Sequence, residues 1–333
     1  MNKTIKFLTT YIFFLTNIYA CLLSSTTILN DLYNPQYIVV DKKFLLIEDN
    51  LKIRMYSAEN IKLIKTIGRK GEGPGEFIGY PYPQILHDSI MISSVGKISF
   101  FNFSGDLMNE QKTKLVTPFV KKLNNKYISH SIKIEKDDFY IQYNIYSSNF
   151  SKELTFYKGK WLLHRDGKRD LFEIYFFDVY NGKIVFALRK GFKIEILDKK
   201  GSILYTIEQP PKNIPFKHKD MENIFKYMDV HNKNKGFVRA MKRKCIKPKY
   251  FPEIRKCIVS DGKIYVVTYL KEKERSECII FNMQGQQLKR TFIPLRVASP
   301  IARPPFTINN YELYQLVENV ENEHWELVIN KIE

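Results

Sequence analysis

The part of this chain that most resembles a chemical motif is the glycine-rich stretch GRKGEGPGEF, residues 68–77. Four of the chain's 15 glycines fall within eight of its residues, namely Gly68, Gly71, Gly73 and Gly75. A phosphate-binding loop needs the pattern G-x-x-x-x-G-K-[ST] before a helix, whereas Glu-Phe follows the last glycine here. We therefore expect a structural connection in which glycine permits a tight backbone and Phe77 fills a seam. A nest of backbone N–H groups that binds an anion is the alternative.

Other catalytic and metal-binding patterns are missing from the sequence. The six histidines include no i,i+4 pair and no H-E-x-x-H motif, so none is predicted to bind a metal. The G-x-S-x-G nucleophile elbow, the calcium-binding loop and the C-x-x-C pair are also missing. Trp161 and Trp325 follow strand spacing, which favours packing over a platform for a sugar. The sequence thus predicts no catalytic residue, no metal site and no cofactor.

The first 21 residues have the layout of a secretory signal. Two lysines precede an apolar run from about residue 7 to Ala20, which is shorter than the roughly 20 residues of a bilayer span. The run IYAC, which ends at Cys21, resembles the site where bacteria cut a lipoprotein before its lipid-modified cysteine. We therefore predict a lipoprotein-type signal peptide at residues 1–20, lipid attachment at Cys21 and a place in the cell envelope. Ordinary cleavage after Ala20 is the alternative.

Positive charge is concentrated in one segment. The net charge is +18, and residues 209–256 hold 14 Lys or Arg against four acids. Such a surface attracts nucleic acid, anionic lipid or acidic polymers, and export argues against nucleic acid. A solvated Lys-rich surface with no ligand is the alternative. The predicted ligand-contact patch, beside Tyr250 and Phe251, consists of Lys242, Arg243, Lys244, Lys247, Lys249 and Arg255.

Three further cysteines follow Cys21 in the sequence: Cys245, Cys257 and Cys278. An exported chain can oxidise a pair of thiols, and Cys245 with Cys257 would close a short loop. The odd count leaves at least one of the three thiols unpaired or bonded elsewhere.

The rest of the chain repeats one pattern: an apolar alternating run, a polar turn ending in glycine, and a second alternating run. It occurs at 97–110, 153–164, 193–208 and 278–292, with the turn glycines Gly105, Gly159, Gly201 and Gly285. A second strand pair lies upstream of each, clearest in NGKIVFALRK (181–190) and DGKIYVVTYL (261–270). Their Asn-Gly and Asp-Gly pairs suit type I′ hairpin turns. One unit therefore contains four antiparallel strands.

Repeated four-stranded units are typical of propeller blades. We predict an all-β fold, a six-bladed β-propeller of four-stranded antiparallel blades over residues 21–333, with a short helical insert at about 209–250. The apolar stripe of MENIFKYM (221–228) is expected to dock this insert. Residues 25–29 are expected to supply the strand that the last blade lacks, which closes the ring. The predicted blades span 34–67, 81–115, 125–165, 171–208, 236–293 and 300–333.

The segment 68–110 resembles the NHL-repeat type of propeller. The slots of that repeat are matched by Gly68, Gly71, Gly75, Phe77, Pro83 and Gly105. The single GxGPGEF, the segment 248–269 and the lipoprotein-like start are similar to the six-bladed, TolB-like propeller proteins that bacteria export. The resemblance covers nearly all of the mature chain, although only the first blade junction has the full glycine set.

The sequence and the resemblance together predict an exported, lipid-anchored β-propeller that acts as a binding or scaffolding module. Its expected partner is a protein or an acidic polysaccharide, reached through the basic insert, with no nucleic acid expected. A metal-dependent, lactonase-like hydrolase at the mouth of the central channel is the second hypothesis, which requires several acids, Asn or His to converge there. A purely structural envelope component is the third.

Overall fold

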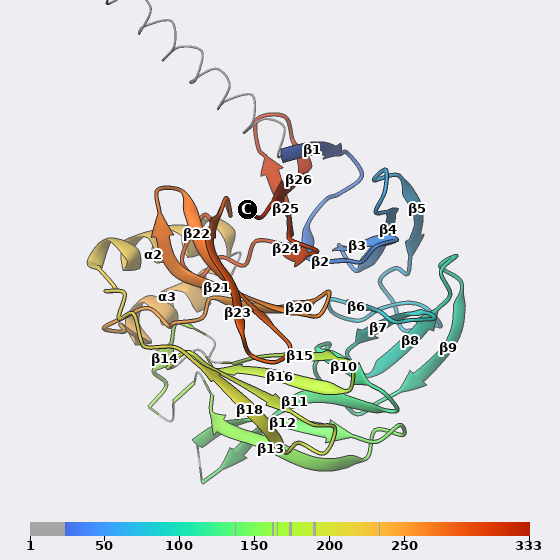
Figure 1. The fold of residues 1–333 in the computed structure, drawn as a ribbon, viewed down its shortest axis with the longest axis horizontal. Helices are drawn as coiled ribbons and strands as arrows, with labels where there is room; N and C mark the ends of the chain where they lie inside the picture. Colours follow the sequence, from blue (N-terminus) through green and yellow to red (C-terminus); the bar gives the residue numbers. More distant parts are fainter. Residues whose placement is uncertain are drawn as a thin grey trace, which may run out of the picture.

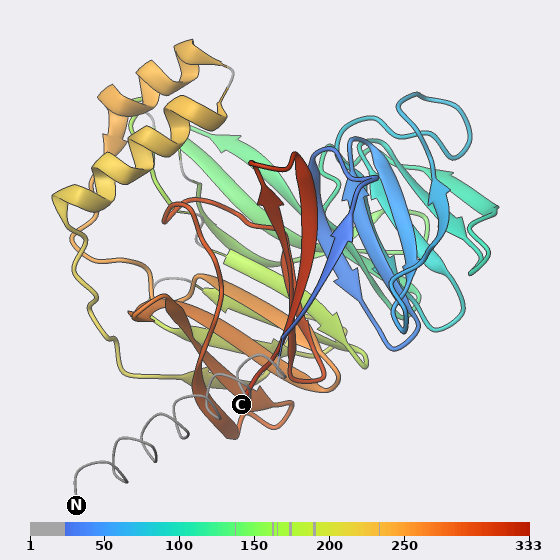
Figure 2. The same ribbon diagram turned by 90° about the horizontal axis from the view of Figure 1, so that it is seen from above.

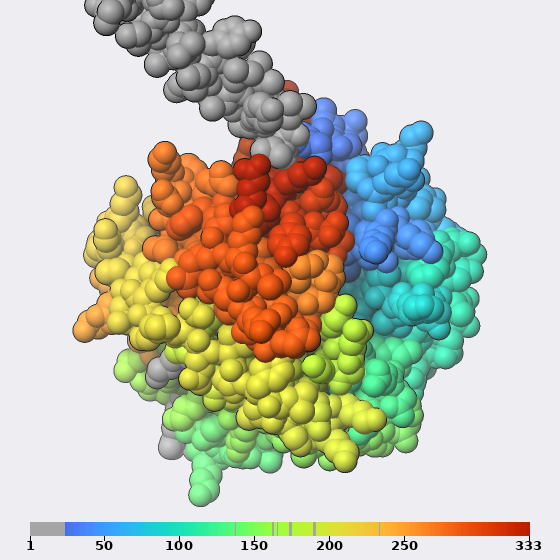
Figure 3. Space-filling view, viewed as in Figure 1, coloured from blue at the N-terminus to red at the C-terminus, as the bar shows by residue number. Residues whose placement is uncertain are grey.

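Six four-stranded antiparallel sheets surround a common axis (Figure 1). This computed structural model describes residues 24–333 apart from 137, 162, 165, 173–174, 189–190 and 233, so the predicted signal peptide and Cys21 lie outside the described residues. The sheets follow the chain around the ring, and the red last blade lies beside the blue first blade (Figure 3). The predicted six-bladed propeller is therefore confirmed.

Each blade runs outward from the axis in chain order, and the first strands of neighbouring blades contact one another. Alternating apolar residues in these strands pack into clusters between adjacent blades, for example Val185 and Ile196 against Ile264 and Ile279. Blade one consists of β2 (Pro35–Val40), β3 (Phe44–Asp49), β4 (Lys52–Ser57) and β5 (Leu63–Ile67). Blade two consists of β6 (Tyr82–Ile85), β7 (Ile90–Ser94), β8 (Lys97–Phe101) and β9 (Leu107–Lys112). Blade three consists of β10 (Val120–Leu123), β11 (Lys126–Glu135), β12 (Asp138–Tyr146) and β13 (Lys152–Lys160).

The sixth blade takes its outermost strand from the beginning of the chain. Thr27 of this strand lies opposite Leu327, and the pairing is antiparallel. The predicted closure by residues 25–29 is therefore confirmed. The strands of the last three blades are β15 (Tyr175–Tyr180), β16 (Lys183–Leu188), β17 (Lys193–Leu197) and β18 (Ile203–Glu208); β20 (Lys256–Ser260), β21 (Lys263–Glu272), β22 (Arg275–Asn282) and β23 (Gln287–Ile293); and β24 (Phe306–Asn309), β25 (Glu312–Asn319), β26 (His324–Lys331) and β1 (Ser24–Leu29).

The turn between the third and fourth strands follows one design in several blades. In blade four, Oδ1 of Asp198 accepts hydrogen bonds from the amides of Lys200 (2.7 Å) and Ser202 (2.9 Å). Gly201 has a φ of +82°, and a Cβ on it would lie 2.8 Å from the Leu154 side chain of blade three. Glycine therefore serves both the turn and the close approach of the preceding blade.

Blade three departs from this design, and the predicted turn at Gly159 is wrong. Gly159 lies inside β13, whereas the turn spans residues 147–151. There the amide of Ser151 donates to Oγ of Ser147 at 3.1 Å, and Phe150 adopts a φ of 63° where blades two, four and five have glycine. The glycine of the repeat pattern was thus matched to a strand residue.

The insert lies between blades four and five. It contains α2 (His218–His231) and α3 (Lys235–Lys244), together with β19 (Cys245–Ile246), which pairs in parallel with β14 (Arg169–Asp170) from the connection before blade four. The predicted start of blade five at residue 236 is therefore wrong, because α3 occupies that position and β20 begins at Lys256. The two helices project beyond the sheets on one side of the ring (Figure 2).

The two faces of the ring differ. Successive strands of a blade run in opposite directions. The fourth strands of all six blades therefore begin on the same face of the ring and end on the other face. Ser24 starts such a strand beside the end of the chain, paired with Asn330, whereas the insert leaves the end of β18 on the opposite face. Figure 2 accordingly places the helices and the C-terminus on opposite sides. We refer to the face with the helices as the insert face and to the face with the C-terminus as the turn face.

Candidate functional site

The glycine-rich stretch 68–77 connects β5 to β6. Phe77 is fully buried in a cluster with Ile67 of blade one and Phe101 of blade two. Gly68 has a φ of +76°, and a Cβ on it would lie 2.1 Å from the Phe77 ring. The backbone therefore passes so close to the ring that only glycine fits, and the ring occupies the seam between two blades.

The amides of this stretch donate to carboxylates of the chain itself. The amide of Gly73 donates to Oε2 of Glu76 at 2.9 Å, and the amide of Gly75 donates to Oε2 of Glu110 at 3.0 Å. Burial acts to raise the pKa of Glu110, but the Gly75 amide, with the nearby Lys97 ammonium, lowers it overall. A negative charge therefore already occupies these donors, which leaves the anion-binding alternative without support.

The helices of the insert form because each has one apolar side. Met221, Ile224 and Met228 of α2 are buried, as are Val238 and Met241 of α3. These spacings of three and four residues place the side chains on one face of each helix. The stripe that the sequence analysis expected to dock the insert therefore faces its packing interface.

An aromatic cluster fixes the insert to the propeller. Phe251 of the insert stacks on Tyr269 of β21 with ring centroids 5.0 Å apart, and Phe172 meets the same tyrosine at 5.4 Å. The parallel pairing of Arg169 with Cys245 adds a second attachment. Because the insert shares this cluster and this bridge with blades four and five, it presents a fixed surface on the insert face.

The structure divides the predicted contact patch. Arg255 is only 7% exposed, and its Nη2 donates to the carbonyl oxygens of Ser299 (3.3 Å) and Ala302 (3.1 Å). It joins the insert to the connection between blades five and six, so its inclusion in a surface patch is wrong. The other five residues are exposed: Lys242, Arg243, Lys244, Lys247 and Lys249.

Two exposed cations on α3, Lys235 and Arg239, were not included in the predicted contact patch. Lys235, Arg239 and Arg243 follow one another at intervals of four residues and form a row along the helix. Lys235 donates to the Asp229 carbonyl at 2.6 Å, and Lys242 pairs with the Asp229 carboxylate at 2.6 Å. The signal that identifies the row is the i,i+4 spacing within a helical pattern, which the strand assignment of this segment concealed.

We call these exposed cations the basic surface. Among the described residues, the side chains of Arg239 and Arg243 make no hydrogen bond and no ion pair. Both guanidinium groups are therefore available to a ligand. Arginine presents a planar fork of donors that matches a carboxylate. The basic surface consists of Lys235, Arg239, Lys242, Arg243, Lys244, Lys247 and Lys249.

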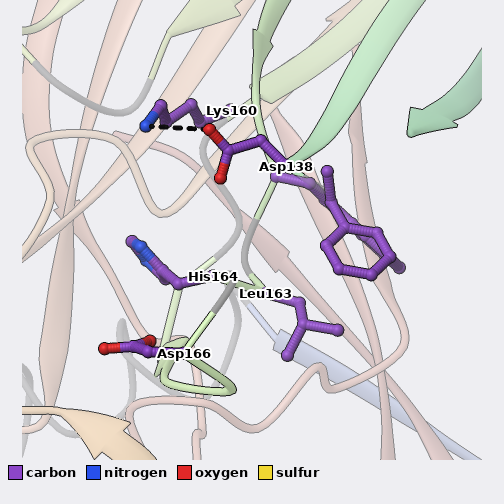
Figure 4. Close-up of a pocket in the computed structure, with 7 residues that line it drawn as sticks. Asp138, Lys160, Leu163, His164 and Asp166 are labelled. Atoms are coloured by element: carbon purple, nitrogen blue, oxygen red, sulfur yellow. Dashed lines mark ion pairs between the residues drawn. The ribbon is translucent and has the colours of Figure 1, made fainter. Parts of the chain in front are cut away.

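A pocket of about 500 Å³ opens at the insert-face end of blade three (Figure 4). Its acids are already paired: Asp138 lies 3.7 Å from Lys160, and Asp166 lies 2.7 Å from Lys168. His164, which also lines the pocket, has its Nε2 3.1 Å from Oδ2 of Asp170. The residues that line the pocket are Asp138, Phe139, Lys160, Trp161, Leu163, His164 and Asp166.

The three described cysteines are all free thiols. Cys245 packs in the insert, whereas Cys257 and Cys278 face opposite sides of blade five, in the clusters shared with blades four and six respectively. The structure therefore does not form the Cys245–Cys257 bond that the spacing allows. Burial raises the pKa of all three thiols, which keeps them protonated.

No family model and no curated protein matches the chain. Solved bacterial structures share its fold. A protein of Bacteroides fragilis, described as a candidate exported protein, superposes with a TM-score of 0.56 at 12% identity, over 93% of this chain and 96% of that chain. A DUF4221 family member from Bacteroides vulgatus gives 0.53 at 13%, with the same coverages. The resemblance to bacterial propellers is thus confirmed for the fold, and the lipoprotein and NHL-repeat features stay predictions.

The described residues contain neither a metal-binding group of side chains nor a membrane-spanning helix. No three His, Cys, Asp or Glu side chains among them are grouped so that they could hold a metal ion. Within the same residues, no helix has the length and apolar character needed to cross a membrane.

Proposed function

We propose that this protein is an exported propeller, tethered to a membrane through Cys21, that binds an acidic protein through the basic surface of its insert. The observation that carries the proposal is the pair Arg239 and Arg243, exposed and unpaired among the described residues on a helix that is fixed to the ring. The planar fork of a guanidinium is pre-organised for a carboxylate, so arginine loses less freedom per hydrogen bond than lysine does.

Apolar side chains beside the basic surface favour a protein over a glycan. Val230, at the end of α2, is 71% exposed, and Tyr250, which follows Lys249, is 37% exposed. Arginine and tyrosine are enriched in protein interfaces, where an apolar centre is surrounded by polar groups. A polysaccharide of uronic acids would use the cations and gain little from exposed Val230.

The position of Cys21 gives the tether a direction. It precedes Ser24 by three residues, which span at most about 11 Å when extended, and Ser24 starts β1 on the turn face. A lipid on Cys21 would hold the turn face towards the membrane and the basic surface away from it. Palmitate labelling and membrane fractionation test the tether, and a Cys21→Ala variant that keeps both label and membrane attachment would rule it out.

Charge reversal of the two arginines tests the binding surface. The Arg239→Glu/Arg243→Glu variant is compared with Lys199→Glu/Lys200→Glu, which makes the same charge change at exposed residues of a turn on the opposite face. The probe is immobilised poly-L-glutamate, with polygalacturonate as a carboxylate glycan. We expect the wild type and the lysine variant to be retained on polyglutamate up to similar salt concentrations, and the arginine variant to elute at much lower salt.

Two outcomes would contradict the proposal. Equal loss of retention in both variants would show that net charge, and not the basic surface, governs binding. Retention on polygalacturonate that exceeds retention on polyglutamate, and that depends on Arg239 and Arg243, would replace the protein partner by an acidic glycan.

A further inference from the structure

Three charged side chains from different blades lie on innermost strands of the ring, and two of them form an ion pair. Lys121 of β10 reaches Asp178 of β15, with Nζ 2.9 Å from Oδ1 and side chains that are 12% and 20% exposed. Lys256 stands on β20, the innermost strand of the next blade, which contacts β15, and the charges of Lys121 and Asp178 both act on its pKa. We call Lys121, Asp178 and Lys256 the axial cluster. All three stand on innermost strands, where blades converge.

The axial cluster has more positive charge than negative. Asp178 pairs with Lys121, and among the described residues no carboxylate forms an ion pair with Lys256. The Nζ of Lys256 donates to the carbonyl oxygen of Phe306 at 2.6 Å and stands 4.0 Å from the centroid of that ring. An ammonium has three donors, and the described residues supply this one hydrogen-bond acceptor. Lys256 is also partly exposed.

We propose that the axial cluster binds a small oxyanion, such as a carboxylate or sulfate group, between Lys256 and Lys121. The anion would accept hydrogen bonds from the donors of Lys256 that the protein leaves unused. It would also balance the second ammonium, because Asp178, which already pairs with Lys121, offsets only one of the two positive charges. This site is separate from the basic surface and does not depend on the function proposed for it.

The surroundings of the axial cluster suit a small ligand. Tyr82 of β6 lies beside Lys121, with Nζ 5.2 Å from the ring centroid, and packs edge-on against Tyr37 and Phe119 at 5.2 and 5.4 Å. Aromatic walls with a few convergent polar groups are typical of small-molecule sites. Lys256 and Tyr82 begin their strands, and innermost strands begin on the insert face. A ligand would therefore enter from that face.

The charge state of Lys256 provides a signature for binding. Burial, and then the neighbouring charges of Lys121 and Arg255, lower the pKa of Lys256 to about 7, while Asp178 acts in the opposite direction. The thiol of Cys257, the next residue in the chain, is a further titratable group, and burial keeps it protonated. A bound anion raises the pKa of a nearby ammonium. Binding near pH 8 should therefore take up a proton.

Calorimetric titration of sulfate into the purified chain tests this inference. Sulfate does not titrate between pH 6 and 9, and sodium chloride at equal ionic strength serves as the reference. We expect binding at pH 6.5 that weakens by up to about tenfold per pH unit above the pKa of Lys256. At pH 8 the measured heat should depend on the ionisation enthalpy of the buffer, because protons are taken up. Absence of saturable binding, or binding without proton uptake, would overturn the proposal.

Variants locate the anion. Lys256→Met should weaken sulfate binding at pH 6.5 by at least about tenfold, the effect of losing a charge-assisted hydrogen bond. Lys263→Met is the matched control, because Lys263 pairs with Asp261 at the other end of blade five, and it should bind as the wild type does. If Lys256→Met does not fold, proton uptake by the wild type still decides. Binding that is lost in Arg239→Glu/Arg243→Glu and kept in Lys256→Met would place the anion on the basic surface and refute the inference.

Discussion

Phe77 shows how one side chain holds two blades together. It is fully buried between blades one and two, and the φ values of Gly68 and Gly75 let the backbone pass around its ring. Phe77→Ala should lower the free energy of unfolding by about 3–5 kcal/mol, because the substitution leaves a cavity in a packed seam. Urea unfolding followed by fluorescence measures the change.

The control for this prediction is Tyr33→Ala. Tyr33 is 80% exposed, so its truncation should change the free energy of unfolding by less than about 0.5 kcal/mol. Equal effects of the two substitutions would show that Phe77 does not bind the blades together.

The sequence predicts the backbone conformation around Phe77, but it does not predict which charged side chains are exposed. The glycine spacing around Phe77 predicted a tight connection, because backbone φ depends on local sequence. Arg255 and Lys249 are both cations in the same basic segment. Arg255 is nevertheless buried, and it donates hydrogen bonds to carbonyl groups more than forty residues further along the chain. Only the tertiary structure separates the two.

The strand β1 closes the ring, although it is the first described element. It supplies the outer edge of blade six, and Leu29 at its end is 4% exposed. Removal of residues 24–29 should lower the melting temperature and promote self-association, because β26 then presents an unpaired edge. The lost burial of Leu29 alone corresponds to about 1.5–3 kcal/mol.

The comparison is between chains that begin at Ser24 and at Asn30. Thermal unfolding and light scattering should both separate them. Equal melting temperatures with both proteins monomeric would contradict the role of β1 as the closing strand.

The elements that were predicted correctly are those with a strong local signal. Asn181-Gly182 and Asp261-Gly262 adopt the left-handed φ values that their hairpin turns require. Blade three was misread because Phe150, and not a glycine, takes the left-handed position in its turn. The segment of α3 was assigned to blade five because its two buried apolar residues, Val238 and Met241, are too few to distinguish a helix from a strand.

At the scale of the whole molecule, the number of blades follows from the sequence, because a repeated unit must stack on its neighbours to bury both faces of its sheets. The axial cluster does not follow from it. Lys121, Asp178 and Lys256 come from blades three, four and five, and no spacing along the chain relates them. The basic surface follows from the sequence only in part. Its positive charge is visible in the sequence, but the row of Lys235, Arg239 and Arg243 forms only when the segment is a helix.

The central claim is that the insert face, turned away from the tether, is the face that binds a protein. Site-specific photocrosslinking in cells tests it most directly, with a benzophenone amino acid placed at position 230, beside the basic surface, or at position 199 of the full chain. The account predicts one discrete crosslinked product, containing an acidic protein, from position 230 and not from position 199. Discrete products from position 199 alone would contradict the account and place the binding surface on the turn face.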